Sequence, residues 1–238
     1  MPIELPEQLS NSTKMDRYPD IFRVARVAAG PEPLRILSFG CSTGEEPLTL
    51  AGTYFPQSQI LGVDVSDEAL DQARSLAAGE PNVHIARSSD AAIAEYGPYD
   101  IIFAMSVLCR NPPPEGHRWE EYPFARFEEA VAGLIGSLKA GGLLVLANAN
   151  YALTQSRLIR HFDLLADPGM RDPGPVWKVA FDGTVLERPA RNDPAARIGT
   201  DCIFRKRSEP WPDRAHVPLR VITPDGTELV TVRLNCRG

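Results

Sequence analysis

The stretch that decides the fold is Gly40-Cys41-Ser42-Thr43-Gly44-Glu45-Glu46, which lies between two segments of different hydrophobic pattern. Before it, Leu34 to Phe39 is a short apolar run bounded by Pro33, as in a buried β-strand. After it, Glu45 to Tyr54 begins with an acidic turn that suits the positive end of a helix dipole. The sequence therefore predicts a strand, a glycine-bounded loop and a helix in succession.

The same alternation continues to about residue 147. Ser66 is a predicted cap for a helix from Asp67 to Ala78, and the turn Gly141-Gly142 is predicted to close a helix from Phe124 to Lys139. Strands that alternate with helices in this way imply a parallel sheet with right-handed crossovers. We therefore predict an α/β fold with a Rossmann-like, doubly wound, mostly parallel sheet. Its further strands are expected at Ile60 to Val63, Val83 to Ala86, Tyr99 to Met105 and Leu143 to Ala147.

Two regions flank this predicted core, which we place at residues 31–210. Residues 1–30 are expected to form an N-terminal helical cover, with the helix at Lys14 to Ala29. Residues 211–238 are expected to form a C-terminal β-hairpin extension around the turn Pro224-Asp225-Gly226. Between residue 147 and the hairpin, we expect a helix at Tyr151 to Leu165 and strands at Val176 to Phe181 and Cys202 to Lys206. Two irregular Pro-containing stretches, Asn111 to Pro123 and Asp167 to Pro175, have the length of functional lids.

Composition narrows the class of function. The net charge is −6 and the pI is about 5.3, which disfavours a nucleic-acid-binding surface because phosphate contacts need clustered Lys and Arg. No stretch approaches the roughly 20 apolar residues of a membrane span. The 4 cysteines are far apart, so neither a metal site nor a disulfide framework is expected. We predict a cytoplasmic protein without a membrane or nucleic-acid partner; the oligomeric state stays open.

The charges of the loop select the kind of ligand. The dinucleotide fingerprint G-x-G-x-x-G is absent, and Glu45 and Glu46 would repel a pyrophosphate at this helix start. Gly40 permits a tight turn, and Gly44 leaves backbone N–H groups facing the ligand. A cationic sulfonium cofactor with an amino group fits the loop, whereas NAD does not.

Polar residues at the ends of the later strands complete the predicted cofactor site. Asp64 ends the second strand, 20 residues after Gly44, and is placed to accept hydrogen bonds from ribose hydroxyls. Asp90 follows the third strand, where a carboxylate can accept from an adenine amino group. Ser106 follows the fourth strand and reaches the same rim of the sheet.

The order of these segments over Lys14 to Ala147 resembles class I S-adenosylmethionine-dependent methyltransferases. The stretch Cys41-Ser-Thr-Gly-Glu-Glu-Pro47 resembles the cofactor loop of the chemotaxis receptor (CheR-type) methyltransferases, and so do Asn11-Ser-Thr13 with Arg17 and Phe103 to Leu108. Unlike those enzymes, the chain has only about ten residues before Asn11 and no obvious β insertion for receptor docking, which argues against a receptor substrate.

The resemblance implies S-adenosylmethionine as cofactor and a role for each matched residue. Thr13 and Arg17 would hold the methionine carboxylate, and a bidentate guanidinium suits that task. Glu46 would hold the methionine amino group, Asp64 the ribose, and Ser106 would line the methionine side. Gly40, Ser42 and Gly44 belong to the same predicted loop.

Candidate catalytic residues follow the fifth strand, at Asn148, Asn150 and Tyr151. Amides can orient a nucleophile, and a Tyr ring can stabilise a sulfonium by a cation–π contact. The alternative interpretation is that the Asn pair ends the strand and caps the next helix. We predict a methyltransferase that acts on a small-molecule acceptor. Two alternatives stay open: intramolecular cyclisation of the cofactor to azetidine-2-carboxylate with release of methylthioadenosine, or a non-catalytic S-adenosylmethionine-binding module.

Overall fold

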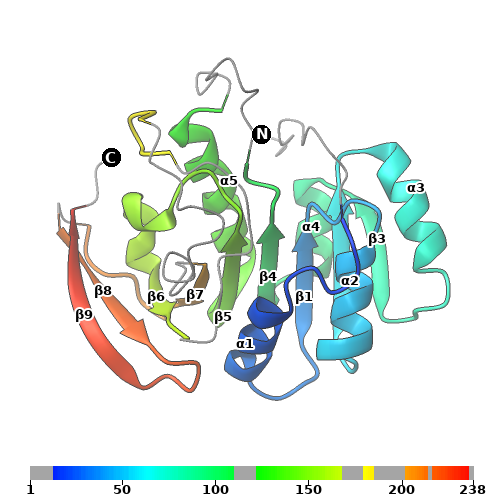
Figure 1. The fold of residues 1–238 in the computed structure, drawn as a ribbon, viewed down its shortest axis with the longest axis horizontal. Helices are drawn as coiled ribbons and strands as arrows, with labels where there is room; N and C mark the ends of the chain where they lie inside the picture. Colours follow the sequence, from blue (N-terminus) through cyan, green and yellow to red (C-terminus); the bar gives the residue numbers. More distant parts are fainter. Residues whose placement is uncertain (1–12, 110–121, 168–178, 185–201, 214–215, 236–238) are drawn as a thin grey trace, which may run out of the picture.

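The structure is a computed structural model, and it describes residues 13–109, 122–167, 179–184, 202–213 and 216–235. Within them, nine strands form one sheet in the order β3-β2-β1-β4-β5-β7-β6-β8-β9 (Figure 1). The strands β3, β2, β1, β4 and β5 pair in parallel, as do β6 and β8. This confirms the predicted α/β, Rossmann-like, doubly wound and mostly parallel sheet.

The first half of the chain supplies four of the five strands in the parallel part of the sheet, together with most of the helices among the described residues. Its elements are α1 (Pro19–Ala29), β1 (Arg35–Phe39), α2 (Glu45–Thr49), the π-helical turn η1 (Leu50–Tyr54), β2 (Gln59–Asp64), α3 (Asp67–Leu76), β3 (Val83–Arg87), α4 (Asp90–Tyr96) and β4 (Tyr99–Met105).

The second half begins with one long helix and ends in the hairpin. Its elements are α5 (Phe124–Ser137), β5 (Leu138–Ala147), the short helices η3 (Leu153–Gln155) and η4 (Arg157–His161), β6 (Phe162–Leu165), β7 (Ile203–Lys206), β8 (His216–Ile222) and β9 (Glu228–Asn235).

Alternating side chains divide the core into two apolar layers. In β1, Ile36 packs with α1 and η1 on one face, whereas Leu37 packs with α4 and α5 on the other. A strand with both faces covered needs apolar residues at consecutive positions, and β1 is buried from its second residue to its last. The sheet is therefore sandwiched between helices, and its carboxyl edge is left to the loops.

Two predicted helices differ from the structure in their bounds, and one helix was not predicted. The first helix begins at Pro19 rather than Lys14, because Pro suits the first helical turn and the preceding residues contact α2 instead. The helix expected to reach Lys139 ends at Ser137, and the two glycines lie inside β5 near an irregularity in its pairing with β4. The helix α4 was not predicted at all.

The region after β5 differs most from the sequence prediction. The single helix expected at Tyr151 to Leu165 is replaced by η3, η4 and β6. Pairing with β7 and β8 is what makes Phe162–Leu165 a strand, and local periodicity does not report such pairing. The strand at Cys202 to Lys206 is confirmed as β7. The predicted hairpin is confirmed as β8 and β9, and β8 pairs with β6, so the hairpin extends the same sheet.

Both predicted lids fall largely outside the described residues, as does the first half of the strand expected at Val176 to Phe181. The described residues 179–181 of that stretch form an isolated bridge and a turn rather than a strand. Among the described residues, no helix has both the length and the apolar character needed to cross a bilayer. Likewise, within the part of the chain that the structure describes, no group of three His, Cys, Asp or Glu side chains could hold a metal ion.

Candidate functional site

The loop after β1 turns sharply because two of its glycines adopt left-handed backbone angles. Gly40 has φ 78°, and a Cβ there would lie 2.4 Å from Val107 Cγ2. Gly44 has φ 96°, and a Cβ there would lie 3.0 Å from Ala73 Cα. Neither position accepts a side chain without displacement of its neighbour. The loop therefore packs tightly at the carboxyl edge, where the order of the strands reverses between β1 and β4 and where such sheets bind ligands.

Glu46 lies in the first turn of α2, directly after this loop, and is partly buried. Ser38 Oγ, from β1, donates a 2.8 Å hydrogen bond to its Oε1. Burial raises the pKa of Glu46 to about 7, and the Ser38 hydrogen bond and the positive charge of Arg17 offset that rise only in part. The site thus holds a carboxylate whose charge is incompletely compensated by the protein, as a binding group for a cationic amino group requires.

The segment before α1 brings Arg17 towards Glu46. The backbone N of Asp16 donates to Thr49 Oγ1 at 2.9 Å, and Tyr54 donates its hydroxyl proton to Asp16 Oδ1 at 2.8 Å. These bonds anchor the segment on α2 and η1. Arg17 is close enough to Glu46 to lower its pKa.

Thr13, predicted to act with Arg17, is the first described residue and is partly buried. Its proposed contact with a methionine carboxylate therefore stays a prediction.

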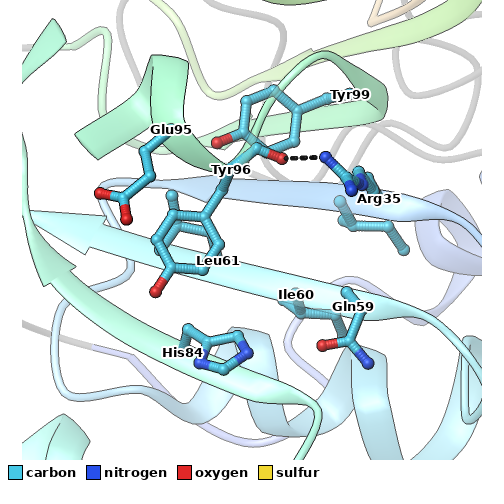
Figure 2. Close-up of a pocket in the computed structure, with 9 residues that line it drawn as sticks. Arg35, Gln59, Ile60, Leu61, His84, Glu95, Tyr96 and Tyr99 are labelled. Atoms are coloured by element: carbon cyan, nitrogen blue, oxygen red, sulfur yellow. Dashed lines mark hydrogen bonds between the residues drawn. The ribbon is translucent and has the colours of Figure 1, made fainter. Parts of the chain in front are cut away.

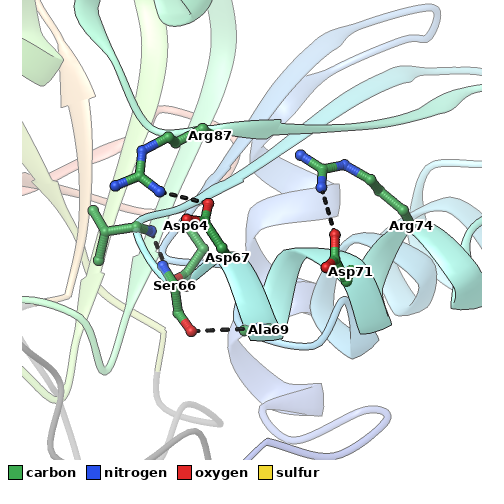
Figure 3. Close-up of polar contacts among 8 residues, drawn as sticks. Asp64, Ser66, Asp67, Ala69, Asp71, Arg74 and Arg87 are labelled. Atoms are coloured by element: carbon green, nitrogen blue, oxygen red, sulfur yellow. Dashed lines mark hydrogen bonds and ion pairs between the residues drawn. The ribbon is translucent and has the colours of Figure 1, made fainter.

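Asp64 ends β2 and ties the loop to that strand. It is buried, and its Oδ2 accepts a 2.8 Å hydrogen bond from the backbone N of Ser42. Its Oδ1 accepts from the backbone N of Val65 and Ser66 at 2.8 and 3.0 Å. Figure 3 shows Asp64 beside Ser66 at the start of α3. A carboxylate offers about four acceptor positions, so these three bonds leave capacity for a hydroxyl donor. This arrangement fits the predicted ribose contact.

The end of β3 places a different polar atom inward than the sequence suggested. Asp90 is exposed in the first turn of α4, and Ser89 caps that helix by accepting from Ala92 N at 3.1 Å. The neighbouring Ser88 instead has a buried hydroxyl oxygen with no hydrogen-bond partner among the described residues, and its backbone N donates to Asp64 O. Sequence reasoning missed Ser88 because a Ser-Ser-Asp run does not reveal which member faces inward.

The ends of β4 and β5 carry a buried polar cluster that we call the Tyr18 network: Tyr18, Ser106 and Asn148. Tyr18 Oη and Ser106 Oγ are 2.5 Å apart. Asn148 Nδ2 donates to Ser106 Oγ at 2.8 Å and to Tyr18 Oη at 3.0 Å. Ser106 and Asn148 have φ 59° and 55°, uncommon for residues other than glycine. Two predicted site residues are thus brought together, and Tyr18, which the sequence analysis did not single out, joins them.

The two other candidate catalytic residues are also buried. Asn150 is buried, its backbone N donates to Leu108 O at 3.1 Å, and its carbonyl accepts from Val179 N at 2.9 Å. Tyr151 packs in the apolar layer of α5, with its ring 5.2 Å from that of Phe124. Its hydroxyl donates to Tyr122 O at 2.7 Å. The structure therefore gives Tyr151 the surroundings of a core residue and differs from the expectation that it lines the reaction zone.

A cavity of about 190 Å³ lies at the opposite edge of the sheet (Figure 2). Arg35 and Gln59, the first residues of β1 and β2, line it together with His84, Glu95 and Tyr96. Because parallel strands begin at this edge, the cavity is separated from Gly40 and Asp64 by the length of the strands. It is not part of the candidate site.

Comparison with known proteins finds a partial similarity to one family. Residues 36–121 match a methyltransferase domain. The match covers 86 of the 238 residues and runs from β1 past β4, so it includes the glycine loop, Asp64 and Ser106. No curated protein sequence is significantly similar to the chain.

Several solved structures are similar in part. The YcgJ protein of Bacillus subtilis is 20% identical with a TM-score of 0.42, over 56% of this chain and 51% of that chain. TrmN of Thermus thermophilus is 25% identical with a TM-score of 0.40, over 52% and 36%. The plantazolicin methyltransferase BpumL, solved in complex with SAH, is 16% identical with a TM-score of 0.39, over 56% and 49%. The chain thus spans about half or less of each of these proteins.

Proposed function

We propose that the protein is an S-adenosylmethionine-dependent methyltransferase that acts on a small-molecule acceptor. The observation that carries the proposal is the match of residues 36–121 to a methyltransferase domain, since this segment contains the predicted cofactor loop. The partly buried carboxylate of Glu46 supports it, because a cationic amino-acid end of a cofactor would supply the charge that the protein does not.

The residues of the site divide among the parts of this cofactor. Glu46 would accept from the amino group, and Arg17 would pair with the carboxylate. Asp64 would accept from the ribose hydroxyls with its remaining capacity. The roles of Arg17 and Thr13 follow the resemblance of the segment to the chemotaxis receptor methyltransferases, and the backbone contacts of Asp16 support them by anchoring the segment on α2.

When bound, S-adenosylmethionine supplies a methyl carbon activated by the sulfonium. An acceptor nucleophile would take this methyl group, SAH would leave with the electron pair of the broken bond, and the proton of the nucleophile would pass to water. The protein's contribution is to align the two partners and exclude water. Asn148 at the end of β5 is the predicted residue best placed to orient an acceptor, since it lies beside Ser106 at the same edge.

A small acceptor is proposed for two reasons. The net charge of −6 disfavours a nucleic acid as substrate. The covers predicted around the sheet are also short, which suits a small molecule better than a folded protein. The location in the cell and the absence of a membrane partner remain predictions from the sequence.

The proposal is tested by incubating the purified protein with S-adenosylmethionine, alone and with a panel of small amines, phenols and carboxylic acids, and quantifying both nucleoside products by mass spectrometry. We expect S-adenosylhomocysteine (SAH) to form only when an acceptor is present. The variant Glu46→Gln is assayed beside the wild type. Glu80→Gln, which removes an exposed carboxylate, serves as its matched control. Methylthioadenosine formed from the cofactor alone, in clear excess over a control without enzyme, would contradict simple methyl transfer and favour the cyclase alternative. Binding without turnover on any acceptor would favour the non-catalytic module.

A further inference from the structure

The Tyr18 network joins three segments that are far apart in the sequence. Tyr18 precedes α1, Ser106 follows β4 and Asn148 follows β5. All three side chains are buried. Ser106 and Asn148 both adopt left-handed backbone angles. Such strain persists only where the surrounding structure over-determines it, and it concentrates at functional sites.

The positions of the protons in the Tyr18 network determine which hydrogen bond it can donate to a ligand. Asn148 uses both protons of its amide nitrogen, one for Tyr18 Oη and one for Ser106 Oγ. A single proton lies between the two hydroxyl oxygens, and either hydroxyl can donate it. If Ser106 donates to Tyr18, the phenol proton of Tyr18 is directed out of the network. The network is then a neutral hydrogen-bond donor that is held in place from two sides.

The charges around Tyr18 identify the part of the ligand that this donor would meet. Tyr18 interacts electrostatically with both Arg17 and Glu46, the residues proposed to bind the two charged groups of an amino acid. The Arg17 guanidinium lies 5.1 Å from the centre of the Tyr18 ring. Burial raises the pKa of the Tyr18 hydroxyl, so the group stays protonated and donates rather than acting as a base. A donor is favourable beside an anion and unfavourable beside a sulfonium cation.

We propose that the Tyr18 hydroxyl, oriented by Ser106 and Asn148, donates a hydrogen bond to the carboxylate of the methionine moiety, beside Arg17 and opposite Glu46. The proposal rests on the proposed function, because it assigns a further binding residue to the same cofactor. It implies that the protein distinguishes adenosine thioethers by their amino-acid end. Tyr18 is therefore a specificity-determining residue.

The test compares two neutral ligands that differ at that end. SAH carries the amino-acid group, and methylthioadenosine has only a methyl group in its place. Their dissociation constants, and that of S-adenosylmethionine, are measured by calorimetry for the wild type, Tyr18→Phe and the control Tyr96→Phe, whose hydroxyl lies at the distant cavity. We expect Tyr18→Phe to weaken SAH and S-adenosylmethionine about tenfold or more. Methylthioadenosine affinity should change less than twofold, and Tyr96→Phe should match the wild type.

Ser106→Ala keeps the proposal falsifiable if Tyr18→Phe does not fold. It should weaken SAH by a smaller factor and spare methylthioadenosine, and the double variant should lose no more than Tyr18→Phe alone. Three results for Tyr18→Phe would overturn the proposal: equal weakening of methylthioadenosine, weakening of S-adenosylmethionine without weakening of SAH, or a change of less than twofold for both SAH and S-adenosylmethionine. A wild type that binds none of the three nucleosides would instead refute the proposed function itself.

Discussion

Two carboxylates, Glu46 in α2 and Asp163 in β6, have opposite surroundings. Asp163 in β6 is buried and accepts hydrogen bonds from two guanidinium groups, at 2.8 Å from Arg207 and 3.0 Å from Arg220 Nε, with a second bond from Arg220. These contacts hold the pKa of Asp163 below its usual value, although burial acts to raise it. Glu46 accepts from the Ser38 hydroxyl, and burial raises its pKa to about 7.

The difference separates a carboxylate that stabilises the fold from one that is held ready for a ligand. Asp163 links β6 to β7 and β8, so its ion pairs join the C-terminal hairpin to the rest of the sheet. The negative charge of Asp163 is balanced within the protein by the guanidinium groups of Arg207 and Arg220. Glu46 lies at the carboxyl edge among strained loop residues, and its charge costs stability until a cation arrives.

Asp163→Asn should have the largest effect. Its loss leaves two guanidinium groups without their anion, and breaking such a pair costs about 3 kcal/mol when one partner is partly exposed. Urea unfolding followed by circular dichroism measures the change, and nucleoside affinity should stay within twofold of the wild type. A fall in affinity as large as that of a site variant would erase the distinction between the two carboxylates.

Glu46→Gln should have the next largest effect, on binding rather than folding. A neutral amide loses the charge-assisted bond to the amino group, so S-adenosylmethionine should bind about 10- to 30-fold more weakly. Calorimetric titration beside the Glu80→Gln control gives the ratio. Equal affinities for the two variants would mean that Glu46 is not a cofactor ligand.

The two carboxylates should also respond to pH in different ranges, Glu46 through cofactor affinity and Asp163 through stability. Glu46 becomes charged as the pH rises through about 7, so cofactor affinity should increase about tenfold from pH 6 to pH 8 and should lose this dependence in Glu46→Gln. The folded-state pKa of Asp163 is lowered, so its contribution to stability is present above its unfolded pKa of 3.8 and is lost as the pH falls below it. Cofactor titrations at several pH values check the expectation for Glu46, and acid unfolding of Asp163→Asn checks the expectation for Asp163.

The smallest expected effect is on the stability of Glu46→Gln. Because the folded pKa of Glu46 is raised from 4.5, its ionisation makes the folded state less stable as the pH rises from about 4.5 to 7. Without ligand at pH 8, the variant should therefore be more stable than the wild type by about 1 kcal/mol. A loss of stability would show that the carboxylate holds the loop together.

Local sequence signals predicted the first half of the fold well. Apolar runs placed β1, β2, β3 and β4 within two residues, and the Ser66 cap was read correctly: its Oγ accepts from Ala69 N at 3.3 Å. These features depend on residues close together in the chain. The segment Phe162–Leu165 was mistaken for helix because its strand state depends on pairing with residues about 40 and 57 positions away.

The candidate site was predictable where one motif carried it. The glycine loop and Glu46 follow from neighbouring residues, and Arg17 came from a family resemblance. Tyr18 could not be found in this way, because its partners lie 88 and 130 positions along the chain. Tyr151 was assigned to the site by its place after β5, but its hydroxyl turns to a carbonyl within the core.

Hydrogen–deuterium exchange with and without S-adenosylmethionine tests whether the cofactor binds at the carboxyl edge of the sheet, because one experiment compares this edge with the other regions of the chain. We expect slower exchange in peptides that cover the loop from Gly40 to Glu46, the end of β2 at Asp64 and the end of β4 at Ser106, and unchanged exchange in β8 and β9. Protection confined to the hairpin or to the cavity at Arg35, or no protection at saturating ligand, would contradict it.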